Sequence, residues 1–387
     1  MSHRTATAKA SAAGLRAFAA KLAKNPVVIG FDGFVDSIIE VVDQRTSPQK
    51  YLPVKTIAQF GQKILAASGQ SSNYELIVKL EKLGGNGPIM ANAMASIGFP
   101  TTYIGSLGYP AMHHVFEPMA KIATCISFCE PGYTDALEFD DGKLMFGKHG
   151  TLTDITAEQL KKVVGDASLI EILSRSQLLG MVNWTMLTKM DSIWHYLMKE
   201  IFPKLTKPAG GAHRVIFIDL ADPEKRTRAD LLACLKRCTE FQKHADVVLG
   251  FNLKEATQVA EVLGIKVGEK PEAEIEPIAR AVLEKLCVKT VVVHPRSGAA
   301  AAIKSGDKIE SAVFAGPLVT RPKLSTGAGD NFNAGFCLGV LAGLPIEQAL
   351  CVGTATSGYY VRNAGSPTIA QLAEFCDNLP APEASAA

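Results

Sequence analysis

The residues best suited to chemistry lie in a glycine-rich segment that runs into a helical pattern. Gly327, Ala328 and Gly329 are followed at once by Asp330, and then by apolar residues at helical spacing over 332–340. Small residues let a backbone turn tightly and come close to a ligand. A helix that begins there directs unpaired N–H groups and the positive end of its dipole at one point. The segment predicts a site for phosphate or a developing negative charge, with Asp330 beside it or acting only as a helix-start residue.

Two carboxylates, Asp32 and Asp36, follow a short apolar run at 26–31 that is typical of a buried strand. In open parallel sheets, ligands bind outside the carboxyl ends of the strands. Carboxylates placed there can accept hydrogen bonds from the paired hydroxyls of a polyol. The alternative is that Asp32 belongs to a turn and Asp36 lies on the surface.

A second glycine turn, Gly84–Gly85, precedes another helical pattern. Its two glycines let the backbone meet a ligand. Pro88 is typical of a first helical turn, so the N-terminus of this helix is expected to face the same ligand. This turn supports a binding pocket near Asp32 and Asp36.

Asn252 and Glu255 stand three residues apart at a predicted helix start that follows a strand. At this spacing the two side chains share one face of the helix. An amide and a carboxylate can hold the waters of a Mg²⁺ ion that stays largely hydrated. The alternative is a capping box, in which the same two residue types satisfy the first N–H groups of a helix.

The elements that would position these residues alternate between strand and helix. Besides 26–31, strands are predicted at 101–105, 177–183, 214–220, 246–251 and 289–294. Helical patterns lie at about 87–98, 111–123, 187–202, 229–243, 253–263 and 275–286. This alternation indicates an α/β fold of three layers (α/β/α), with a central and mostly parallel sheet.

Two segments do not fit this alternation. Residues 136–146 are predicted to form a hairpin that turns at Asp141–Gly142. Residues 37–83 are too long for a simple strand-to-helix connection and include a predicted helix near 56–66. Long interruptions close to a binding strand often form lids or oligomer contacts. We expect one domain over 1–387 with a small β lid, from lid and insertion segments at about 36–83 and 124–150, and a possible homodimer through that lid.

Composition excludes several classes of partner. The 387 residues carry a net charge of +2 with dispersed Lys and Arg, which argues against nucleic acid. The eight Cys include no Cys-x-x-Cys, so they indicate a reducing compartment with neither a disulfide framework nor a zinc site. No apolar run approaches the roughly 20 residues that span a bilayer. The first 31 residues lack acids, but their amphipathic stripe favours a leading surface helix of a cytoplasmic protein over a transit peptide.

The segments 83–98, 248–256 and 323–336, in this order, resemble the signature motifs of the ribokinase-like (PfkB) carbohydrate kinases. The resemblance covers about 26–379. It implies an ATP-dependent kinase that transfers the γ-phosphoryl group to a hydroxyl of a sugar or sugar-like molecule. It also implies a ribokinase-like fold, with ATP and Mg²⁺ as cofactors.

The resemblance assigns roles to individual residues. Asp330 would be the general base, beside the N–H groups of Gly327, Ala328 and Gly329 that stabilise charge on the phosphoryl group. The residues expected to hold the acceptor are Asp32, Asp36, Gly85, Asn86 and Asn92. The residues expected to bind the nucleotide or, through water, its metal are Asn252, Glu255, Gly298 and Asn363.

Two departures from the family pattern qualify this assignment. Ile89 stands where the family usually has Asn, which leaves the acceptor open. Leu324 stands where members that bind a monovalent cation have Asp, which argues against potassium activation. One alternative is a nucleoside kinase on the same fold, because Phe31, Phe34 and Tyr109 could stack on a base. The other is a catalytically silent ligand-binding or scaffold protein.

Overall fold

A nine-stranded sheet forms the centre of the computed structural model, which describes residues 1–206 and 213–384. Its strand order is β14-β13-β12-β11-β10-β9-β1-β5-β6. The strands from β12 to β6 are parallel, whereas β13 and β14 form an antiparallel hairpin at one edge. The strands are β1 Val27–Phe31, β5 Thr101–Gly105, β6 Thr124–Ser127, β9 Leu178–Val182, β10 Val215–Asp219, β11 Asp246–Phe251, β12 Thr290–Val293, β13 Gly298–Ser305 and β14 Lys308–Ala315.

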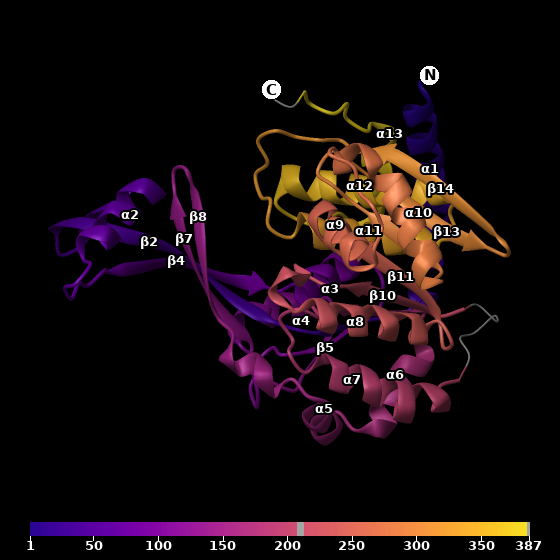
Figure 1. The fold of residues 1–387 in the computed structure, drawn as a ribbon, viewed down its shortest axis with the longest axis horizontal. Coiled ribbons are helices and arrows are strands. Elements are labelled where there is room, and N and C mark those ends of the chain that lie inside the picture. The colour runs from indigo at the N-terminus through magenta and orange to yellow at the C-terminus, as the bar shows by residue number, and fades with distance from the viewer. Residues whose placement is uncertain (207–212, 385–387) are drawn as a thin grey trace.

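Helices cover both faces of this sheet (Figure 1). Successive side chains of a strand point to opposite faces, so in β10 Ile216 and Ile218 pack on one layer while Phe217 packs on the other. One layer contains α1 His3–Ala19, α3 Asn86–Ile97, α4 Glu117–Ala120, α11 Ala328–Leu341, α12 Ile346–Asn363 and α13 Ile369–Asp377. The other contains α5 Ala157–Val163, α6 Asp166–Arg175, α7 Met190–Tyr196, α8 Arg228–Phe241, α9 Leu253–Val262 and α10 Ile275–Leu286. The predicted three-layer fold is confirmed.

The predicted elements differ from the structure in a few places. The helical pattern at 111–123 yields only a short 3₁₀ turn, η2 His114–Phe116, and the four-residue α4. Helices α5 and α6 were not predicted. The leading amphipathic stripe forms α1, whose Leu15 and Phe18 pack into the core. Of the helices described, none combines the length and apolar character that a membrane crossing needs. All eight cysteines are free.

A second, five-stranded sheet extends from the body at the left of Figure 1. Its strands are β2 Phe34–Ser47, β3 Lys50–Pro53, β4 Leu76–Gly84, β7 Gly132–Phe139 and β8 Gly142–Lys148, and α2 Ile57–Ala66 covers it. A small core of its own includes Ile39, Val41 and Phe60. We call residues 34–84 and 132–148 the lid. The hairpin at Asp141–Gly142 is confirmed, although the long strands β2 and β4 were not predicted. That the whole chain is one domain stays a prediction.

Candidate active site

The glycine-rich segment forms the predicted turn into helix α11. Gly327 is the N-cap of this helix with φ +88°, and a Cβ there would lie 3.0 Å from Ile89 Cγ2, so only glycine fits. The N–H of Ala328 donates to Ser325 O, 3.2 Å away. The N–H groups of Gly329 and Asp330 find no acceptor among the described residues. These two N–H groups, rather than that of Ala328, are therefore available to an anion.

Asp330 lies in the first turn of α11 and is 7% exposed. Its Oδ1 accepts a hydrogen bond of 2.9 Å from Nδ2 of Asn86, the first residue of α3. Two motifs that are 244 residues apart in the chain thus meet through one hydrogen bond. The bond sets the carboxylate of Asp330 beside the turn formed by Gly84 and Gly85.

Asp32 holds the start of α3 in place. One of its oxygens accepts from the N–H of Asn86 at 3.0 Å and the other from the N–H of Gly87 at 2.9 Å. The amide of Asn183, at the end of β9, adds a third bond of 2.8 Å. Burial raises the pKa of Asp32 to about 6, although these hydrogen bonds act to lower it. Both oxygens are already engaged, so the geometry gives Asp32 a positioning role, and its contact with an acceptor stays a prediction.

Asp36 lies on β2 against the glycine turn at the base of the lid. A Cβ on Gly84 would stand 2.5 Å from the carboxyl carbon of Asp36, so glycine is needed for this approach. Asp36 is 7% exposed, and burial raises its pKa although the charge of Lys82, its register partner on β4, opposes this. Asp36 therefore approaches Gly84, next to Gly85 in the chain, and a role of Asp36, Gly85 and Asn86 in holding an acceptor stays a prediction.

Asn252 and Glu255 form a complete capping box at the start of α9. The N–H of Glu255 donates to Asn252 Oδ1 at 3.0 Å, and that of Asn252 donates to Glu255 Oε2 at 2.9 Å. Both side chains also line the large cavity described below. Asn252 and Glu255 therefore cap the helix and also line the cavity, so the two interpretations of this pair are compatible.

Asp219, which belongs to none of the sequence motifs, lies at the carboxyl end of β10 and lines the same cavity. Burial raises the pKa of Asp219 to about 6. Burial and then the charge of Asp219 raise the pKa of Glu255 to about 8 and that of Asp330 well above its usual range. A cation among these three carboxylates would relieve both the desolvation and the mutual repulsion.

Asn333 adds an oxygen to this acidic site. Its Nδ2 donates to Asp219 Oδ2 at 2.8 Å, while its buried Oδ1 has no partner among the described residues. Carboxylate and amide oxygens are the ligands that Mg²⁺ prefers. The donor set therefore fits a hydrated Mg²⁺ ion. The signal for Asp219 was its position at the end of a predicted strand, the same rule that selected Asp32 and Asp36.

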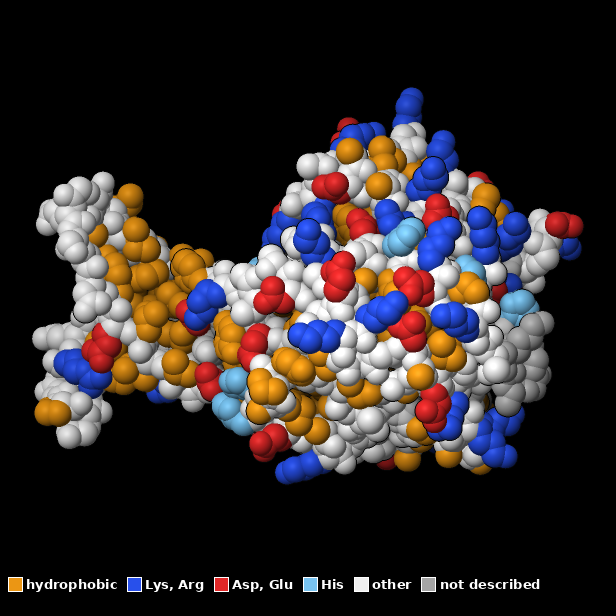
Figure 2. Space-filling view, turned by 90° about the horizontal axis from the view of Figure 1, so that it is seen from below, with side chains coloured by type: hydrophobic (Ala, Val, Ile, Leu, Met, Phe, Trp, Pro, Cys, Tyr) orange, Lys and Arg blue, Asp and Glu red, His pale blue; other side chains and the backbone are white. Residues whose placement is uncertain are grey.

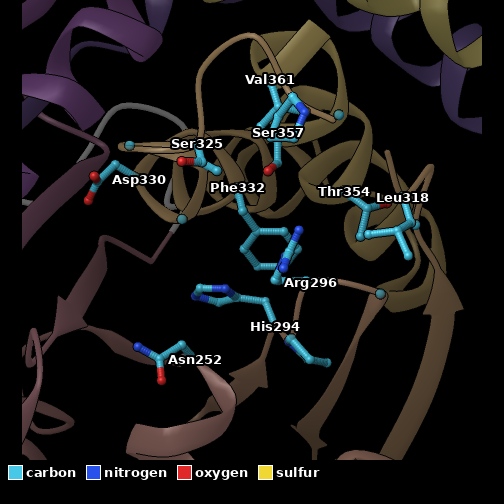
Figure 3. A pocket seen from close by; sticks show the side chains of 18 of the residues that line it. Asn252, His294, Arg296, Leu318, Ser325, Asp330, Phe332, Thr354, Ser357 and Val361 are labelled. Atoms are coloured by element: carbon cyan, nitrogen blue, oxygen red, sulfur yellow. The ribbon is translucent and has the colours of Figure 1, made fainter. Parts of the chain in front are cut away.

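A cavity of about 450 Å³ connects five of these residues, namely Asn86, Asp219, Asn252, Glu255 and Asp330. Figure 3 shows Asp330 at one end and Leu318 and Thr354 at the other, with His294 and Phe332 between them. The rings of His294 and Phe332 stack with centroids 4.5 Å apart, and burial lowers the pKa of His294 to about 4. The cavity is polar near Asp330 and more apolar toward Leu318, which suits a ligand with a charged end and a flat, less polar end.

The predicted nucleotide residues divide between this cavity and the surface. Gly298 lines the cavity, and a Cβ there would lie 2.5 Å from Phe314 O. Asn363 does not line the cavity: it is exposed and its Nδ2 donates to Tyr359 O of its own helix at 2.9 Å. Val361, two residues earlier on α12, lines the cavity instead. A contact of Asn363 with a nucleotide stays a prediction.

Asn92 also lies outside the large cavity. It lines a separate cavity of about 100 Å³ together with Ile89, Lys82 and Leu324. Six residues along a helix from Asn86, its side chain cannot share the face of Asn86 that meets Asp330. The structure therefore brings Asp330 and Asn86 together and leaves Asn92 in a separate cavity.

Comparisons with known proteins agree on one group of enzymes. The sequence model of the family described as "Prokaryotic ketohexokinase" matches residues 3–379. A ketohexokinase of Haloferax volcanii is 28% identical over 351 residues, which are 90% of each chain. The fold is similar to that of Arabidopsis thaliana ribokinase complexed with ribose and ATP, with a TM-score of 0.59, 18% identity, and 92% of this chain and 99% of that one covered. Adenosine kinase from Sinorhizobium meliloti gives a TM-score of 0.57 at 16% identity, with 92% and 99% covered.

Proposed function

The chain belongs to the prokaryotic ketohexokinase family, and we propose that it transfers the γ-phosphoryl group of ATP to a hydroxyl of a ketohexose. It is an ATP-dependent sugar kinase, the enzyme class that the motifs predicted, and the family match does not favour the nucleoside kinase. The observation that carries the proposal is the 2.9 Å bond between Asn86 and Asp330, because it joins the acceptor side of the site to the phosphate side. The free cysteines and the use of ATP suit the cytoplasmic setting that we also propose.

Asp330 is the general base of the proposed mechanism. Its carboxylate takes the proton of the acceptor hydroxyl as the oxygen attacks the γ-phosphorus, while the bond from this phosphorus to the bridging oxygen breaks and ADP leaves. The raised pKa of Asp330 makes it a stronger proton acceptor than an exposed Asp. The N–H groups of Gly329 and Asp330, at the positive end of α11, stabilise the negative charge that develops on the phosphoryl group.

Asp219, Glu255 and Asn252 are the residues that we propose to hold Mg²⁺, through water. When bound, the ion would neutralise charge on the phosphates. Glu255 also accepts from the N–H of Asp222 at 2.9 Å, so its carboxylate is fixed in orientation by the backbone. The carboxylates would hold the ion through its waters, and the apolar end of the cavity near Leu318 and Val361 would receive the base of ATP. That no monovalent cation is needed stays a prediction from Leu324.

The acceptor lies, in our proposal, at the base of the lid. Asp36 and Asn86 offer hydrogen-bond partners to its hydroxyls, and the backbone at Gly85 allows close approach. Asp32 acts through α3, whose N-terminus it fixes. The lid excludes water, which otherwise competes with the sugar for the phosphoryl group.

A comparison of acceptors tests the proposed function. With Mg-ATP, we expect kcat/KM for D-fructose to exceed that for D-glucose and for adenosine by about tenfold or more, because a site built to hydrogen-bond one set of hydroxyls discriminates against analogues that lack it. ADP formation measured for each compound, with ATP alone as the blank, gives these ratios. Higher kcat/KM for adenosine would favour the nucleoside kinase. No turnover with any acceptor would favour the silent protein.

We also propose that a second copy of the chain covers the apolar surface of the lid. Leu76, Val78 and Leu80 of β4 are 43%, 51% and 56% exposed, and Met145 of β8 is 51% exposed. Figure 2 shows this side of the lid as a continuous hydrophobic area. Exposed apolar strands of this kind pair with another chain unless they are protected.

Replacing Leu80 with Glu is expected to raise the dimer dissociation constant by about tenfold or more, because a charge would be buried at the contact. Sedimentation velocity over a range of concentrations measures this shift. Leu232→Glu, at a residue of α8 that is 41% exposed on the body, is the matched control and should leave the dimer intact. A wild-type chain that sediments at 41.2 kDa at every concentration would contradict the proposal.

A further inference from the structure

Three metal-ligating side chains meet where the lid joins the body. Glu81 belongs to β4, whereas His113 and His114 lie at the start of η2 on the body. One ligand atom of each side chain lies within 4.8 Å of those of the other two, and this is the one such group in the part of the chain that the structure describes. We propose that Glu81, His113 and His114 bind a divalent cation of the zinc class.

The geometry is close to that of a zinc site. In a tetrahedral site, bonds of about 2.0–2.2 Å place neighbouring ligand atoms about 3.3–3.6 Å apart. Glu81 Oε2 and His114 Nε2 already lie 3.5 Å apart. The side chains of Glu81 and His114 are 39% and 66% exposed, so small rotations can close the remaining gaps at little cost in packing. Solvent supplies the fourth ligand.

The ligand types select the metal. Imidazole nitrogens favour Zn²⁺, Ni²⁺ and Cu²⁺, whereas Mg²⁺ and Ca²⁺ require oxygen ligands. Two imidazoles and one carboxylate therefore distinguish this site from the acidic site around Asp219. The two sites bind different cations.

The surroundings orient the two histidine rings. The rings of His113 and His114 stack with centroids 4.5 Å apart. Nδ1 of His113 accepts a long hydrogen bond of 3.4 Å from the N–H of Val115, so in this tautomer the ring proton is on Nε2. Metal binding at Nε2 moves the ring proton to Nδ1 and breaks the bond to Val115. The loss costs little, because 3.4 Å is near the limit of a hydrogen bond.

The position of the site has a mechanical consequence. The last four residues of β4, from Glu81 to Gly84, lead into the glycine turn at the proposed acceptor site, while η2 is part of the body. A metal shared by Glu81 and the two histidines ties the base of the lid to the body. It therefore favours the lid position seen in Figure 1 over any position that separates β4 from η2.

Cobalt titration tests the proposal directly, since Co²⁺ replaces Zn²⁺ and has visible absorption. The protein carries no affinity tag and has Cys287→Ser, because Cys287 is the exposed cysteine. We expect saturable binding of one Co²⁺ per chain, displacement by Zn²⁺ but not by Mg²⁺, and an affinity about tenfold or more weaker in Glu81→Gln and in His114→Asn.

His3→Asn is the matched control, because His3 also pairs with a glutamate, at 2.7 Å from Glu347, but has no third ligand among residues 1–206 and 213–384. It should bind Co²⁺ as the parent does. The absence of saturable Co²⁺ binding in the parent protein would overturn the proposal. So would unchanged affinity in both Glu81→Gln and His114→Asn, provided that their melting temperatures match that of the parent.

Discussion

Asp330→Asn is expected to lower kcat by about 10²–10⁴-fold, the range typical of removing a general base. ATP affinity should be unchanged, because the N–H groups of Gly329 and Asp330 remain in place. Single-turnover measurements of sugar phosphate formation give the rate, and equilibrium binding of an ATP analogue gives the affinity. Near-wild-type turnover in this variant would remove Asp330 from the mechanism.

A comparison of melting temperatures shows whether the Asp330→Asn variant is still folded, and the burial of Asp330 predicts its result. Asn keeps an oxygen that can accept from Asn86 Nδ2, so the 2.9 Å contact survives. Burial raises the pKa of Asp330 in the folded chain, so the wild type is favoured at low pH and loses stability as rising pH forces this carboxyl to ionise. An amide does not ionise. The melting temperature of the variant at pH 8 should therefore equal or exceed that of the wild type.

Glu255→Gln is expected to raise the Mg²⁺ concentration for half-maximal turnover by about 10–100-fold, as loss of a group that orients metal ligands does. The change removes a negative charge that faces Asp219 across the proposed metal site. This Mg²⁺ concentration is measured by titrating turnover with Mg²⁺ at saturating sugar and fixed ATP. A titration that superimposes on that of the wild type would leave Asn252 and Glu255 with a capping role alone.

The chain contains a control for this substitution. Thr368 and Gln371 form another capping box, at the start of α13, in which Gln371 Oε1 accepts from the N–H of Thr368 at 2.9 Å. A glutamine can therefore serve at this position of a capping box. Gln371→Glu adds a charge to a capping box that does not line the cavity, and it should leave the Mg²⁺ titration unchanged.

The sequence predicted those parts of the site that lie within one motif. Gly327 to Asp330 and Asn252 with Glu255 are local patterns, in which spacing along the chain determines which side chains share a turn or a helix face. Asp219 and its partner Asn333 are 114 residues apart, so no local pattern joins them. Only the position of Asp219 at a strand end marked it. Asn92 shows the opposite case, because proximity to Asn86 in the sequence did not place it on the same helix face.

The position of the lid in the sequence was predicted, but its long strands β2 and β4 and their pairing were not. The central body strands, such as β1, are apolar and buried on both faces, whereas β2 changes from buried at Phe34 to exposed from Asp43 almost to its end. Its pattern is therefore not that of a buried strand. Its pairing with β4 and β7 comes from residues far away in the chain, and a register shift between Ile38 and Ile39 interrupts it. The length of segment 37–83 indicated an insertion, whereas its shape depends on the pairing of β2 with β4 and β7.

A structure of the protein with a ketohexose and a non-hydrolysable ATP analogue tests the central claim most directly. The account predicts that the sugar lies between Asp36, Gly85 and Asn86, with one hydroxyl oxygen about 2.6–3.2 Å from a carboxylate oxygen of Asp330 and facing the γ-phosphate. A sugar bound elsewhere, or an Asp330 carboxylate out of reach of every hydroxyl while the γ-phosphate lies at α11, would contradict it.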